Sequence, residues 1–238
     1  MTDTFLQDFE DRKRQVRHYL AVVSRAEREG GMGSTRVQEG RLLTLRAGTF
    51  LVLYNLIEAT TRGAIEAIHD KITTNEVPFP LLTLSLRKEV VRLFKKGADP
   101  ANDHTMDDFP SAFVAVALIK SVKMSGSVDA KAIRELALCY GFSSLTNKDS
   151  TRNGHDLVTI KSNRNDLAHG RKTFEQVGRD YGTAELLLLA RRSMRYMDEI
   201  LKNIAAYLDE AGYLAKKTPD APDATDPLEE ILLATPPA

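Results

Sequence analysis

The sequence predicts an all-α protein, an up-and-down helical bundle with a small helical insert and a disordered acidic C-terminal tail. Almost every long segment repeats its apolar residues every three or four positions, which is the period of one helix face. No segment alternates apolar and polar residues between hairpin turns, as the strands of a sheet would. Glycines follow several of these periodic segments, as is typical of helix ends. Long antiparallel helices joined by loops form a bundle of this kind.

Two long helices open the predicted bundle. Apolar residues spaced from Phe5 to Val23 mark the first helix, which a pair of glycines ends. The second helix covers residues 40–72 and is about 50 Å long at about 1.5 Å per residue. Its middle, residues 50–57, is apolar on most sides. We therefore expect more than one neighbouring element to bury it.

Five further helices are predicted, over residues 81–96, 111–122, 129–140, 157–169 and 183–211. Asp129 can cap the first turn of one of them, and Gly170 ends another. Between residues 98 and 154 the regular pattern lapses, and we interpret this part as an insert. The prediction is thus one helical domain over residues 1–216, which contains the insert, followed by a tail over residues 217–238.

The composition is typical of a protein of the cytoplasm. Cys139 is the sole cysteine, which excludes an internal disulfide and a cysteine-rich zinc module and favours a reducing compartment. No apolar run reaches the roughly 20 residues that span a bilayer. The charged N-terminus lacks the apolar stretch of a secretory signal. We expect a cytoplasmic protein with no membrane partner.

The net charge of zero hides an asymmetry between the body and the tail. The chain has 33 basic and 33 acidic residues, which excludes a histone-like protein, but the five acids after Lys217 have no basic neighbour. With five prolines in the same stretch, this tail cannot pack a core of its own. The short amphipathic pattern at residues 227–234 fits a segment that folds onto a partner, such as an antitoxin or a basic cleft, and equally a passive solubilising terminus.

One stretch, residues 161–172, could carry chemistry. The common phosphate loops, the nucleophile elbow and the zinc-protease motif are missing from the sequence. On a helix, Asn165 and His169 share one side, so the amide can orient the imidazole for proton transfer. The long side chain of Arg164 can reach the same side. The same residues also fit a helix C-cap and a solvated surface pair without function.

The Arg-Asn-x-x-x-His pattern at residues 164–169, followed by Gly170, is similar to the signature of the HEPN superfamily. In that family an arginine and a polar residue precede a histidine by a short spacer, late in a helical bundle and ahead of a further long helix. The architecture matches over residues 5–212. The segment Tyr54–Glu58 also looks like bacterial members of the family.

This resemblance implies a HEPN-like bundle and a metal-independent endoribonuclease that acts as a toxin or phage-defence effector. RNA would be cleaved by attack of its 2′-hydroxyl in a composite site of a homodimer, without a cofactor. His169 would act as general acid or base, Arg164 would bind the scissile phosphate, and Asn165 would orient the imidazole. An antitoxin or another defence-system protein is the expected partner. The alternative is a non-catalytic assembly or regulatory module that binds a partner protein or a nucleotide.

Further side chains are predicted to bind the substrate or support the site: Lys161, Asp166, Arg171, Lys172 and Glu58. Residues 148–172 hold six basic against three acidic side chains, an excess that would attract a phosphate backbone. A charge run of this kind also fits a solvated face. Glu58 lies in an apolar helix, where a carboxylate needs a partner. It braces Arg164 or pairs with another basic side chain, and we favour the second, structural role.

Overall fold

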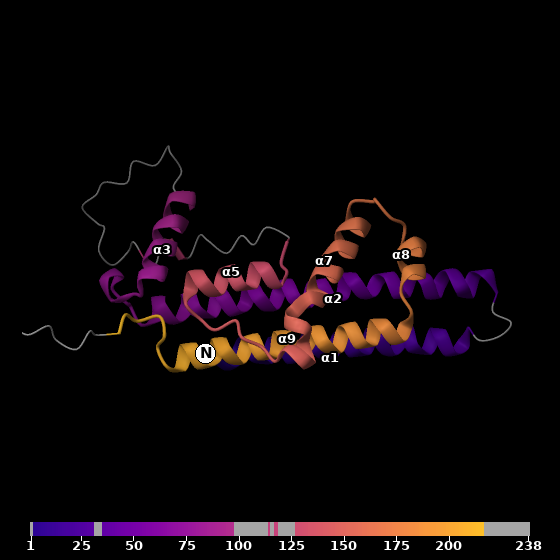
Figure 1. Ribbon diagram of the computed structural model, residues 1–238, viewed down its shortest axis with the longest axis horizontal. Coiled ribbons are helices and arrows are strands. Elements are labelled where there is room, and N and C mark those ends of the chain that lie inside the picture. Colours follow the sequence, from indigo (N-terminus) through magenta and orange to yellow (C-terminus); the bar gives the residue numbers. More distant parts are fainter. Residues whose placement is uncertain (1, 31–34, 98–113, 115–116, 119–126, 217–238) are drawn as a thin grey trace, which may run out of the picture.

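The structure, a computed structural model, describes residues 2–30, 35–97, 114, 117–118 and 127–216 (Figure 1). Within these ranges the elements are helices, and a single isolated bridge joins Leu82 to Leu214. The all-α prediction is confirmed. Most of the predicted helix over 111–122 and the whole tail from residue 217 lie outside the described residues. The limits of the insert remain a prediction.

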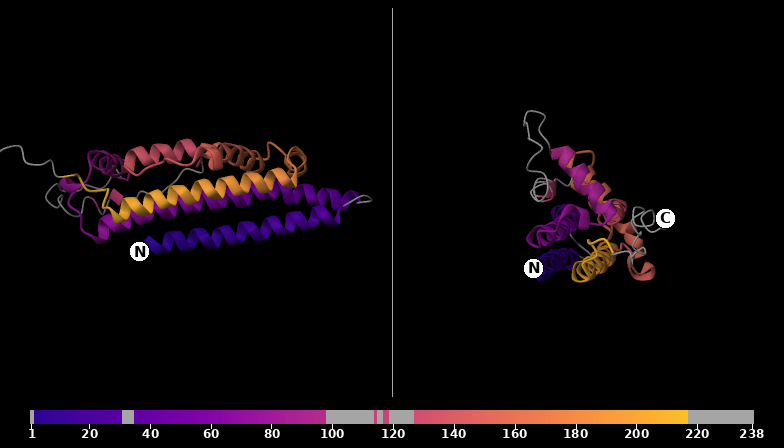
Figure 2. Two further views of the ribbon diagram at one scale, coloured as in Figure 1. Left: turned by 60° about the horizontal axis from the view of Figure 1, so that its bottom comes forward. Right: turned by 90° about the vertical axis from the view of Figure 1, so that its left-hand side faces the viewer.

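Three long helices run along the molecule: α1 (Thr2–Glu29), α2 (Arg36–Thr74) and α9 (Thr183–Asp209). Figures 1 and 2 show them side by side, with α2 and α9 running in one direction and α1 in the other. The apolar stripe predicted for the first helix is buried, with Phe9, Val16 and Val23 in the core. The first two helices begin a few residues earlier than the periodicity predicts, and both end close to the predicted positions.

The middle of α2 is enclosed on several sides, as its apolar pattern predicts. The helix packs against α1, α7 (His155–Ala168), α8 (Phe174–Asp180) and α9. Leu53 and Ile57 are fully buried there. Among the described helices, α2 is long and apolar enough to cross a bilayer, but half of its apolar stretch is buried in the bundle. The central helix of a bundle has the same length and composition.

The shorter elements complete the body. They are η1 (Phe79–Leu81), α3 (Leu84–Gly97), α5 (Ala130–Tyr140), α6 (Lys148–Thr151) and η3 (Arg152–Gly154), together with α7 and α8. Asp129 caps α5 as predicted, because its carboxylate accepts from the backbone N–H of Ala132 at 2.9 Å. Helices α6 and α8 were not predicted. Ile133 and Tyr140 of α5, which lie within the predicted insert, are buried in the same core as the long helices.

A tight corner directs the chain into α7. Arg152, Asn153 and Gly154 all have left-handed backbone conformations, with φ of 51°, 51° and 74°. A Cβ atom on Gly154 would lie 2.7 Å from the side chain of Ala130 and 2.8 Å from that of Tyr196. Just beyond the corner, the buried carboxylate of Asp156 accepts a hydrogen bond from Arg192 of α9 at 2.5 Å. The first turn of α7 is therefore held to α9.

Candidate functional site

The Arg-Asn-x-x-x-His motif lies at the C-terminal end of α7, with His169 as the C-cap of the helix. The helix is held there by buried Leu167 and Asn163. The side-chain amide of Asn163 donates to the Thr159 carbonyl and to the Tyr181 hydroxyl, at 3.0 Å each. Because these contacts fix one face of the helix, the neighbouring positions are left at its surface.

The guanidinium of Arg164 lies on an aromatic ring. Its Cζ atom is 4.3 Å from the centroid of the Tyr54 ring on α2, within range of a cation–π interaction. Tyr54 is buried, which raises the pKa of its phenol, and its hydroxyl accepts from the backbone N–H of Val128 at 3.1 Å. The Nη1 atom of Arg164 donates to Asn165 Oδ1 at 3.0 Å. Arg164 has no acidic partner among the described residues, so its positive charge is not neutralised.

His169 is the C-cap of α7 and its backbone is tightly held. Its N–H donates to the Asn165 carbonyl at 3.0 Å, and Gly170 follows with φ of 65°. The N–H groups of Gly170 and Arg171 donate to the carbonyls of Leu167 and Asp166, which is the Schellman arrangement of a helix end. The prediction that Gly170 ends this helix is confirmed.

The imidazole of His169 is exposed. Within the part of the chain that the structure describes, its ring nitrogens have no hydrogen-bond partner. The hydrogen bond between the side chains of Asn165 and His169 that the four-residue spacing suggested is not seen there, and the amide oxygen of Asn165 accepts from Arg164. The guanidinium of Arg164 lies on the Tyr54 ring of α2, and no hydrogen bond between it and His169 is seen in the described chain. A single chain, as far as the structure describes it, therefore holds the Arg164 guanidinium and the His169 imidazole near the end of α7 without a hydrogen bond between them.

The basic side chains around the motif are mostly paired. Lys161 forms an ion pair with Asp129 at the start of α5. Arg171 lies 2.8 Å from Asp166, and Lys172 lies 3.4 Å from Asp180. With Arg152 also paired, to Asp156, only Lys148 and Arg164 of the six basic residues in 148–172 have no acidic partner within the described chain. The positive charge at this surface is thus smaller than the sequence count suggests.

Glu58 takes the structural role. Its carboxylate lies 3.0 Å from Arg62 one turn along α2, and it is close enough to Tyr54 for its charge to raise the pKa of that phenol. It is not paired with Arg164. Sequence analysis missed Tyr54 as part of the site, although the residue opens the Tyr54–Glu58 segment that looks like other family members. Tyr54 and Arg164 lie on helices far apart in the sequence, so the spacing of residues along the chain does not reveal their contact.

Metal-binding groups do not gather in the described part of the chain, where no three His, Cys, Asp or Glu side chains are placed to hold an ion. Cys139 is partly buried against the core, and burial raises the pKa of its thiol. Cys139 therefore acts as a small packing residue.

A family model matches most of the chain. The MAE_28990-like HEPN domain matches residues 1–213, which covers all the helices described above. No curated protein and no solved structure shows a significant match. A match over most of the sequence, on an all-helical bundle with the Arg-Asn-x-x-x-His motif at the end of α7, means that the chain belongs to the MAE_28990-like HEPN family.

Proposed function

We propose that this protein is a metal-independent endoribonuclease of the HEPN type that works as a homodimer. The observation that carries the proposal is the end of α7. There an unpaired arginine lies on a buried aromatic ring, five residues before an exposed histidine, in a chain of the HEPN family. A guanidinium with free N–H groups binds phosphate in a fork, and an imidazole transfers protons near neutral pH.

The reaction needs only these groups. His169 takes the proton from a ribose 2′-hydroxyl as its oxygen forms a bond to the adjacent phosphorus. Arg164 neutralises the charge that develops on the phosphoryl oxygens. The bond from phosphorus to the 5′-oxygen then breaks, and an imidazolium protonates the leaving oxygen. The products are a 2′,3′-cyclic phosphate and a 5′-hydroxyl.

A second copy of the chain would complete the site. Within one chain His169 lacks an orienting partner and Arg164 is turned to α2. In a symmetric dimer with the two α7 ends facing, each copy supplies one arginine and one histidine to a shared cleft. One imidazole then serves as the base and the other as the acid.

The cellular role that fits this activity is that of a toxin or phage-defence effector, restrained by an antitoxin or another defence-system protein. Induced expression of the protein should then arrest growth, and His169→Ala should abolish the arrest. The assay compares colony counts at equal protein levels. Arrest that persists in the variant would contradict a role for the imidazole in toxicity.

The biochemical test is RNA cleavage by the purified protein in EDTA. We expect His169→Ala and Arg164→Ala each to lower the rate by about 10²-fold or more. His18→Ala is the matched control, because His18 is an exposed histidine on α1 outside the motif. Circular dichroism checks that all variants fold. Undiminished cutting by both motif variants would refute the catalytic assignment.

A second candidate is a non-catalytic assembly or regulatory module that binds a partner protein or a nucleotide. The ion pairs of Lys161, Arg171 and Lys172 favour it, because they leave little free positive charge to hold a nucleic acid. Under this alternative RNA survives long incubation with the wild-type protein and expression is harmless. The two assays above therefore separate the candidates.

A further inference from the structure

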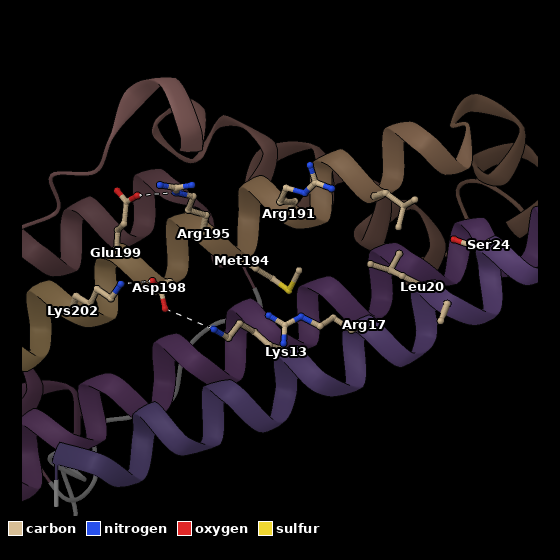
Figure 3. Close-up of a pocket in the computed structure, with 12 residues that line it drawn as sticks. Lys13, Arg17, Leu20, Ser24, Arg191, Met194, Arg195, Asp198, Glu199 and Lys202 are labelled. Carbon is tan, nitrogen blue, oxygen red and sulfur yellow. Dashed lines mark ion pairs between the residues drawn. The ribbon is translucent and has the colours of Figure 1, made fainter.

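A groove lies on the surface between α1 and α9. Its volume is about 800 Å³, and it is lined only by residues of these two antiparallel helices (Figure 3). No residue of α7 lines it, and Figure 1 shows α7 rising away from α1 and α9. The groove is therefore separate from the candidate site.

The groove has unpaired positive charge. Five basic and two acidic side chains line it. The acids are already engaged: Asp198 lies 2.8 Å from Lys202, and Glu199 lies 3.5 Å from Arg195. Arg17 on α1 and Arg191 on α9 are exposed and have no acidic partner among the described residues. These two guanidinium groups are free to bind an anion.

Apolar side chains lie beside these charges. Leu20, Leu187 and Met194 line the groove, and Leu187 is 37% exposed. Figure 3 shows Met194 and Arg17 extending into the space between the helices. A phosphate backbone would use the cations alone, and no aromatic ring lines the groove for a base to stack on. The mixture fits a peptide that is both acidic and apolar.

We propose that residues 217–238 of the same chain bind in this groove. Beyond Lys217 this tail has five acidic and no basic residues, against an excess of three basic residues along the groove. Leu228, Ile231 and Leu232 flank two of its acids and match the apolar lining. The pattern combines ionic contacts with the burial of an amphipathic face. This proposal does not depend on the endoribonuclease proposal.

The tail is long enough to reach the groove. The described chain ends at Lys216, seven residues after α9, where the Ala215 N–H donates to the Leu81 carbonyl at 2.8 Å; Lys202 lies two turns before the end of α9. The far end of the groove, at Leu187, is about 33 Å from the end of α9 at about 1.5 Å per residue. An extended tail spans about 70 Å at about 3.3 Å per residue. Because the tail is tethered, its effective concentration at the groove is on the order of millimolar, so weak contacts suffice.

Photo-crosslinking in the full chain tests the proposal. A photoreactive amino acid placed at Leu232 should form cross-links to α1 and α9 peptides that line the groove, identified by mass spectrometry. The double variant Arg17→Glu/Arg191→Glu should lower the yield of these cross-links several-fold. Arg28→Glu is the matched control, since it reverses an exposed charge on α1 outside the groove. Adding Glu229→Lys and Glu230→Lys to the double variant should restore part of the yield.

Three results would overturn the proposal. The first is a yield that the double variant leaves unchanged, or cross-links that map outside the groove. The second is cross-linking mainly between chains in a mixture of light and isotope-labelled protein, which would make the occupant a second copy. The third is a double variant that binds single-stranded RNA more weakly while its tail cross-links are unaffected, which would assign the groove to RNA.

Discussion

At the scale of single residues, the contact between Arg164 and Tyr54 sets the position of the motif arginine. Tyr54→Leu removes the ring under the guanidinium, and we expect about 0.5–2 kcal/mol less stability from this contact alone, together with slower RNA cleavage. Tyr54→Phe keeps the ring and loses only the hydroxyl that accepts from the Val128 N–H. It should therefore retain RNA cleavage, while its free energy of unfolding falls by about 1 kcal/mol. Urea denaturation and cleavage rates of both variants measure the two effects. Equal cleavage by the leucine and phenylalanine variants would show that the ring does not position Arg164.

The buried histidine His69 should make the stability of the fold depend on pH. Burial lowers its pKa to about 4, against the opposing effects of the Leu118 backbone and Glu89, and its Nε2 lies 2.7 Å from the Tyr140 hydroxyl. The unfolded chain has a histidine pKa of about 6.5, so it binds this proton more readily than the folded state. Full stability is therefore present above about pH 6.5 and falls toward pH 4, by up to about 1.4 kcal/mol per pH unit.

The variant His69→Gln should remove this dependence. Its free energy of unfolding, measured by urea denaturation between pH 4 and 7, should change less with pH than that of the wild-type protein. His18→Gln, at an exposed position, is the control and should retain the wild-type slope. If His69→Gln retains that slope as well, His69 is not the group that titrates.

Sequence predicted the motif but only part of its surroundings. Arg164, Asn165 and His169 follow a fixed spacing on one helix, and Gly170 marks its end, so local reasoning places them. The turn of Asn165 toward Arg164 depends on where the Tyr54 ring holds the guanidinium. That ring comes from α2, so the arrangement is decided by packing between helices rather than by spacing.

At the scale of helices, two glycines give opposite predictions. An added Cβ on Gly63 in α2 meets no atom within 4 Å, so Gly63→Ala should stabilise the protein by about 0.5–1 kcal/mol. On Gly178 in α8 it would lie 2.0 Å from the Leu43 carbonyl oxygen of α2, so Gly178→Ala should cost about 1–3 kcal/mol. Thermal and urea denaturation measure both. A neutral Gly178→Ala would mean that α8 does not pack closely on α2.

The long helices were predictable because their apolar stripes run for many turns. The short helices α6 and α8 were missed because one or two turns give too little periodicity. A signal for α8 was present, however, since Thr173 and Gln176 form a capping box in which each side chain bonds the backbone of the other. The same pair type, Thr35 and Gln38, begins α2.

At the scale of the whole molecule, the proposed dimer predicts complementation. Arg164→Ala and His169→Ala proteins are each expected to be inactive. Mixed and allowed to exchange subunits, they should form dimers in which one copy supplies the arginine and the other the histidine, and these should recover part of the cleavage rate. Cleavage of RNA by the mixture is compared with each variant alone. Activity no higher than that of the separate variants would mean that two chains do not share one site.

Mutations at the corner at residues 152–154 should affect folding, whereas mutations at the exposed His169 should affect only activity. Gly154 admits no side chain, so random substitutions there should appear in a library screen as low yields of soluble protein. At His169 every side chain fits the open surface except that of proline, which lacks the backbone N–H bonded to the Asn165 carbonyl, so the same screen should find normal yields for the other variants and differences only in phenotype. Sequencing the functional variants of such a library would therefore show which positions of α7 and its caps are required for folding and which are required for activity.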